Sequence, residues 1–134
     1  MATGFQGKFH RERCIGRFVK ELVRRSHARC ELCEKGGVQL MAFEVTPLLE
    51  EPAPDRCVFV CDACLKSLRR PEKAMPAHWR CLNHAIWSEV PVVQVVSIRL
   101  LRRLARGGER WAEELVEQAW LDPETEAWAD EAEG

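Results

Sequence analysis

The sequence predicts a small α+β domain, in which a β-hairpin module carrying four cysteines precedes a mainly helical remainder. Two C-x-x-C pairs have 27 residues between them, strand-like apolar stretches lie within that interval, and most of the chain beyond residue 73 has helical periodicity. These observations divide the 134 residues into three segments. They are an N-terminal amphipathic helix over 1–27, a four-cysteine module over 28–72, and a helical segment with an acidic tail over 73–134.

The first segment has the pattern of one amphipathic helix from Arg11 to Ser26. Its apolar residues recur at i, i+3, i+4, i+7 and i+8, which places them on one face. They are Ile15, Phe18, Val19, Leu22 and Val23. A second stripe is basic and consists of Arg13, Arg17, Lys20 and Arg24. We expect this stripe to face solvent, where it can contact nucleic-acid phosphates.

The middle segment reads as a β-hairpin with a long loop. A Gly36-Gly37 turn precedes an apolar stretch over 38–45, three prolines mark a loop over 47–54, and a second strand-like run covers 57–60. A helix is then expected from Asp62 to Arg70, because Pro71 ends it. The second C-x-x-C pair would therefore lie at a strand-to-helix junction.

The remainder is predicted to be helical over 78–87, 92–106, 109–120 and from 123 to about 129. The β-branched run over 92–98 would suit a strand, but the leucines and arginines after it follow a helical period. The five tryptophans are expected to pack this segment against the cysteine module.

Composition is typical of a soluble globular protein, since 46% of residues are hydrophobic and 31% are charged. With no apolar leader and no long apolar run, the expected location is the cytoplasm. Seven cysteines, an odd number, fit reduced thiols or metal ligands better than a disulfide framework. Residues 1–29 carry a net charge of +6 and residues 109–134 one of −9, so the two ends either meet or present opposite faces to partners.

The strongest motif is the pair of C-x-x-C sequences at Cys30 and Cys33 and at Cys61 and Cys64. Two intervening residues let a tight turn direct both sulfurs at one ion, and two such pairs complete the tetrahedral shell of Zn²⁺. The sequence therefore predicts one zinc per chain. Because four thiolates leave no open position, its role would be structural. Redox dithiols and an iron or iron–sulfur centre are the alternatives.

The other cysteines, Cys14, Cys57 and Cys81, are expected to be small apolar core residues. A possible second metal or acid–base site is formed by His78, Cys81 and His84, which lie near one face of the predicted helix. His10 and His27 have no partner spacing and are expected to be surface residues.

Several stretches of the chain resemble the PhnA family, small zinc-binding proteins named after a bacterial phosphonate-utilisation operon. The stretches are Arg29–Cys33, Val58–Cys64, His78–Asn83, Trp87–Val95 and Leu121–Ala129. The resemblance implies a zinc-ribbon-like module followed by helices, without an established activity. The sequence ends where longer members continue into a C-terminal β-domain, so this is expected to be a form lacking that domain.

The cysteine pairs and the hairpin also resemble the treble-clef scaffold of HNH nucleases. Phe43-Glu44-Val45 stands where those enzymes place histidine, and Glu44 is the one candidate Mg²⁺ ligand there. The sequence therefore predicts no catalytic residue. It favours a non-enzymatic module that binds a protein or nucleic acid and no membrane. The alternatives are a metal-dependent hydrolase linked to phosphonate metabolism and a degenerate HNH-like scaffold.

Overall fold

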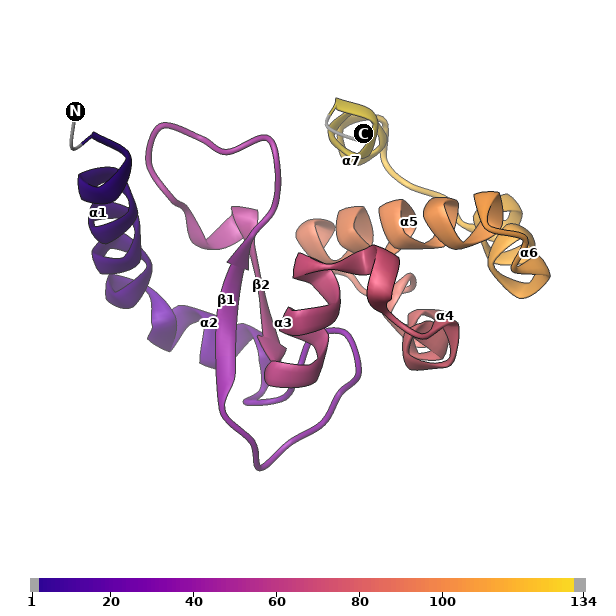
Figure 1. Ribbon diagram of the computed structural model, residues 1–134, viewed down its shortest axis with the longest axis horizontal. Coiled ribbons are helices and arrows are strands. Elements are labelled where there is room, and N and C mark those ends of the chain that lie inside the picture. The colour runs from indigo at the N-terminus through magenta and orange to yellow at the C-terminus, as the bar shows by residue number, and fades with distance from the viewer. Residues whose placement is uncertain (1–2, 132–134) are drawn as a thin grey trace.

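The computed structural model describes residues 3–131 (Figure 1). The chain is a mostly helical small domain with one two-stranded antiparallel hairpin. Its helices and strands are, in order, α1 (Thr3–Arg17), α2 (Val19–Ser26), β1 (Leu40–Glu44), β2 (Cys57–Cys61), α3 (Asp62–Arg69), α4 (Leu82–Ala85), α5 (Pro91–Arg106), α6 (Arg110–Gln118) and α7 (Pro123–Glu131). Short 3₁₀ turns cover Pro54–Arg56, Pro71–Lys73 and Pro76–Cys81.

The N-terminal segment is two helices, so the prediction of one continuous helix is wrong. The break is at Phe18, whose φ of −116° and ψ of 15° leave the helical region. Gly16 lowers helix propensity just before this point. The break lets Phe18 and Leu22 pack together with Cys57 and Phe59 of β2, and burial of these side chains compensates for the interrupted helix.

The hairpin pairs Leu40 with Cys61 at one end and Glu44 with Cys57 at the other. Every residue of β2 is buried, because the strand is covered on both faces. Cys57 and Phe59 face the N-terminal helices, whereas Val58 and Val60 belong to the main core. Two covered faces explain why Cys57–Cys61 is a continuous apolar run with no polar alternation.

Helix α5 is the centre of the main core, packing against α4, α6, α7 and β2 (Figure 1). Its buried residues include Val92, Val93, Val95, Val96 and Ile98. The prediction of a helix over 92–106 is confirmed despite these β-branched side chains, since burial on several sides outweighs their modest helix penalty.

The expected helix over 78–87 is instead a 3₁₀ turn followed by the four-residue α4. Trp79 in this region is 1% exposed and fully within the core. The tryptophan prediction is wrong for Trp87 and Trp120, which are 53% and 74% exposed. The other two join segments, since Arg80 stacks on Trp111 and Trp128 Nε1 donates a hydrogen bond to the Thr46 carbonyl.

Within the described residues, the two charged ends approach each other at a cavity that Arg25 of α2 lines together with Asp122 and Glu124. Helix α1 lies on one side of the hairpin, and α5, α6 and α7 lie on the other (Figure 1). Asp130 of the acidic tail pairs with Arg102 of α5, at 2.7 Å. Within residues 3–131, no helix combines the length and apolar character needed to cross a membrane.

We predict that Trp79→Ala lowers the free energy of unfolding by about 3–5 kcal/mol, because it removes a fully buried indole from the core. Thermal or denaturant unfolding measures this loss. Trp120→Ala is the matched control, and its mostly exposed side chain should change stability little. Equal effects of the two substitutions would contradict the assigned core.

Candidate metal centre

The first cysteine pair lies in a tight turn that follows α2. His27 and Ala28 have positive φ values of 57° and 59°, which end the helix and reverse the chain. The turn is then closed by hydrogen bonds from the Cys30 amide to the Lys35 carbonyl and from the Glu34 amide to the Cys30 carbonyl. The Cys33 amide points at Cys30 Sγ, 3.4 Å away, which is a favourable contact for a thiolate.

A buried ion pair fixes this turn to the hairpin. Arg25 of α2 forms two hydrogen bonds, of 2.9 and 2.6 Å, to the carboxylate of Glu31, whose side chain is 5% exposed. The same guanidinium donates to the carbonyls of Pro54 and Cys57. Glu31 also exchanges hydrogen bonds with the backbone of Phe59, through its own amide and through Oε1. Glu31, the first of the two residues between the cysteines, is thus fixed against β2.

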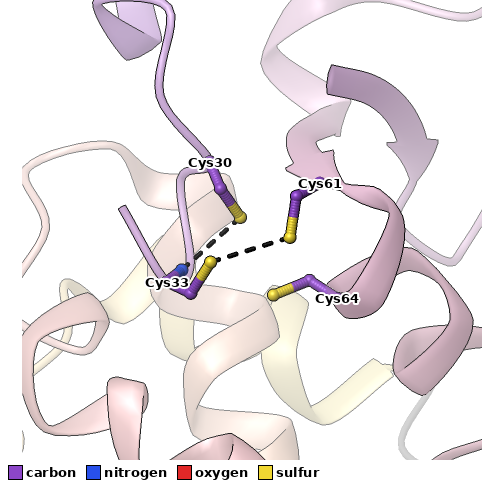
Figure 2. Close-up of side chains that lie close together, drawn as sticks. All are labelled: Cys30, Cys33, Cys61 and Cys64. Carbon is purple, nitrogen blue, oxygen red and sulfur yellow. Dashed lines mark hydrogen bonds between the residues drawn. The ribbon is translucent and has the colours of Figure 1, made fainter. Parts of the chain in front are cut away.

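The second pair lies at the strand-to-helix junction, as the sequence predicts. Cys61 ends β2, and Cys64 is in the first turn of α3. Figure 2 shows the four sulfurs directed at one point from the turn, the strand end and the helix. All four Sγ atoms lie within 4.8 Å of one another, and those of Cys33 and Cys61 are 3.6 Å apart. A tetrahedral ion with Zn–S bonds near 2.3 Å requires sulfurs about 3.8 Å apart, so this donor set can hold a metal ion.

Crowding perturbs the protonation of three of the thiols. A hydrogen bond from Cys64 lowers the pKa of Cys30, and that same contact, with burial, raises the pKa of Cys64. Burial raises the pKa of Cys33. The fold therefore favours the thiolate form of Cys30 and the protonated forms of Cys33 and Cys64. A bound metal has to displace those protons.

His78 lies beside the cluster, with Nε2 3.4 Å from Cys64 Sγ, and its ring packs edge-on against Trp79. An imidazole N–H at this position can donate to a metal-bound thiolate and orient it, a common role of residues just outside a metal's ligand shell. His78 lies in the 3₁₀ turn Pro76–Cys81, and from there its side chain can support the four-cysteine cluster.

The structure does not bring His78, Cys81 and His84 together as a second site. Within the described residues, ligand atoms of three or more such side chains converge within 4.8 Å at two places only, and neither contains these three. Cys81 Sγ donates to the His78 carbonyl, and burial raises its pKa to about 12. His84 is exposed and lines an open cavity of about 670 Å³ together with Trp87, Arg29 and Arg25.

The second convergence consists of His10, Cys14 and Glu51. Cys57 is buried among Phe18, Leu22 and Phe59, as expected, and burial raises its pKa to about 12. Cys14, in contrast, is not the core residue that the sequence suggests, since it is partly exposed and faces His10. The spacing of four residues between His10 and Cys14 in a predicted helix could have revealed that these two side chains lie close together. Glu51 could not be found in this way, because it comes from a distant loop.

The basic residues predicted for the N-terminal segment are all exposed on α1 and α2. They are Arg13, Arg17, Lys20 and Arg24. Glu44, the one candidate magnesium ligand of the HNH comparison, is occupied by two hydrogen bonds from Arg11, of 2.8 and 2.6 Å. The hairpin therefore offers no free carboxylate at that position.

Comparisons with known proteins give no match to a protein-family model, a curated protein or a solved structure. The resemblance to the PhnA family thus stays a prediction from motifs. Assignment of the site rests on its own geometry.

We predict that Zn²⁺ binding to the metal-free protein releases at least two protons near pH 7, from Cys33 and Cys64, whose pKa values are raised in the fold. Affinity should therefore fall by about 100-fold or more for each pH unit of acidification, since each displaced proton contributes tenfold. Calorimetry in buffers of different ionisation enthalpy counts the protons. Release of none would mean that the thiols are not the ligands.

Proposed function

We propose that the protein is a non-enzymatic zinc module that binds an acidic macromolecule, in which one structural Zn²⁺ is held by Cys30, Cys33, Cys61 and Cys64. The convergence of four sulfurs within 4.8 Å carries this proposal. Zinc suits four thiolates in a tetrahedron and needs no electronic stabilisation of that geometry. A cysteine turn, a hairpin and a helix, with the second pair at the junction of hairpin and helix, follow one another in the order of a treble clef.

The closed shell argues against hydrolysis at this metal. Catalytic zinc usually has three protein ligands and a water in the fourth position, whereas four cysteines occupy every position. His78 is directed at a ligand sulfur rather than at an open space where water would be activated. The function supported best is therefore stabilisation of a binding surface.

That surface is the exposed cations of α1 and α2, which are Arg13, Arg17, Lys20 and Arg24. Among the side chains that the structure describes, none forms an ion pair with any of these four cations. Arg13 and Arg17 are four residues apart on α1, and Lys20 and Arg24 are four residues apart on α2, so each helix carries two of these cations at helical spacing. Several exposed cations on neighbouring helices favour a partner with repeated negative charge. Helix α1 lies across the hairpin from the acidic α6 and α7 (Figure 1).

A second feature is the open cavity beside the cysteine turn. It is lined by Arg25, which Glu31 neutralises, by Arg29 and Glu34, and by Trp87, an indole exposed at 53%. An exposed aromatic ring next to cations is a suitable platform for stacking an unpaired base. This observation favours nucleic acid, with an acidic protein surface as the other class of partner.

We expect the protein to bind mixed-sequence single-stranded DNA or RNA with an affinity that falls steeply between about 50 and 200 mM salt. Replacing Arg13, Arg17 and Arg24 together by Gln should weaken binding and reduce the slope of log K against log salt by about 2, because two or three phosphate contacts are lost. Fluorescence anisotropy at several salt concentrations measures both quantities.

The matched control replaces Arg69, Arg70 and Lys73 by Gln, which removes the same charge from the end of α3 and the 3₁₀ turn that follows it. This control should retain most of the slope. Identical effects of the two triple variants would show that net charge, not the exposed cations of α1 and α2, governs binding. Absence of binding at low salt would reject nucleic acid as the partner.

A further inference from the structure

Three side chains of different ligand chemistry meet on the surface far from the four-cysteine cluster. His10 and Cys14 are four residues apart on α1 and share one face of the helix. Glu51 reaches them from the loop between β1 and β2. His10 Nε2 lies 3.0 and 2.8 Å from the two carboxylate oxygens of Glu51, and Cys14 Sγ lies 3.6 Å from His10 Nε2 and 3.3 Å from Glu51 Oε2.

Arg11 holds the loop in place. Besides its two bonds to Glu44 of β1, its guanidinium donates to the carbonyls of Leu49 and Glu50, at 2.9 and 3.2 Å. The residue adjacent to His10 thus fixes the backbone immediately before Glu51 against α1. Because Glu44 neutralises Arg11, this clamp adds little positive charge beside the three side chains. The three side chains therefore meet because Arg11 fixes the loop against the helix, and not through chance proximity of exposed side chains.

The distances fit a small tetrahedral ion. Bonds of about 2.0–2.3 Å to nitrogen, oxygen and sulfur place neighbouring ligand atoms about 3.3–3.8 Å apart. Both separations from Cys14 Sγ lie in this range. The His10–Glu51 separation of 2.8 Å is shorter, as expected for a shared proton, and has to widen by about 0.5 Å when an ion replaces that proton.

We propose that His10, Cys14 and Glu51 form a second metal site, which binds Zn²⁺ or a similar divalent transition ion and exchanges it with solution. One nitrogen, one sulfur and one oxygen ligand leave the fourth tetrahedral position open for water or an external ligand. The site is accessible, since His10 and Glu51 side chains are 51% and 61% exposed. It therefore differs from the closed four-cysteine cluster in ligand set, coordination and rate of exchange.

The test adds Co²⁺ to the zinc-loaded full chain and records the sulfur-to-cobalt charge-transfer absorption. The wild type should show the absorption of one bound thiolate, and Cys14→Ser should lose it. Glu51→Gln, which removes the carboxylate charge but keeps its shape, should weaken Co²⁺ binding by about 10-fold or more. Glu50→Gln is the matched control, because that side chain is exposed and lies outside the cluster. It should bind Co²⁺ like the wild type.

A second measurement uses Zn²⁺ and does not depend on spectra. Alkylation of Cys14, followed by peptide mass analysis, should slow when Zn²⁺ is added to the wild type, and in Glu51→Gln the same slowing should need about 10-fold more Zn²⁺. Far-UV circular dichroism checks that each variant stays folded. Equal Co²⁺ absorption in the wild type and Cys14→Ser, or alkylation of Cys14 unaffected by Zn²⁺, would overturn the second site. Neither outcome bears on the four-cysteine cluster, whose ligands are unchanged in every variant.

Discussion

Four thiols directed at one point are the constraint on which the rest of this structure depends. They come from the turn after α2, from the end of β2 and from the start of α3, so one ion on these sulfurs joins three separate segments. Cys30, Cys61 and Cys64 are also members of the main core, together with Trp79 and the valines of α5. A chain of this size has a modest core, and a metal cross-link adds binding free energy to folding. The four-cysteine cluster and the hydrophobic core are therefore parts of one packed unit.

Arginine clamps organise the loops around that unit. Arg25 fixes the cysteine turn to β2, Arg11 fixes the loop over residues 46–53 to α1, and Arg99 of α5 donates to the carbonyls of Thr46, Trp128 and Ala129. Each guanidinium reaches carbonyls in segments distant in sequence. The planar array of donors in arginine suits this purpose, since several bonds form from one ordered side chain. The arginines that order these loops also position two carboxylates. Arg25 holds Glu31 beside the four-cysteine cluster, and Arg11 holds the loop that carries Glu51 beside His10 and Cys14.

Sequence patterns predicted the parts of the fold that depend on local periodicity. The two strands, α3 and α5 were indicated by apolar stretches, by turn signals, by proline positions or by helical spacing, and the meeting of Cys30, Cys33, Cys61 and Cys64 was indicated by their paired spacing. The break at Phe18 could not be predicted, because it depends on packing against Phe59, a distant residue. Exposure of Trp87 and Trp120 likewise depends on which helix faces are covered in the tertiary structure. The convergence of Glu51 with His10 could not be predicted for the same reason, since a tertiary contact between residues distant in sequence, and not a local pattern, brings them together.

The central claim is that the four thiols are the ligands of the metal ion proposed at this cluster. Zinc-edge X-ray absorption on the Cys14→Ser variant, loaded with one equivalent of Zn²⁺, isolates the four-cysteine cluster from the second site. We predict four sulfur neighbours at about 2.3 Å and no nitrogen or oxygen ligand. A first shell containing nitrogen or oxygen, or a chain that retains no zinc and remains fully folded, would contradict the central claim.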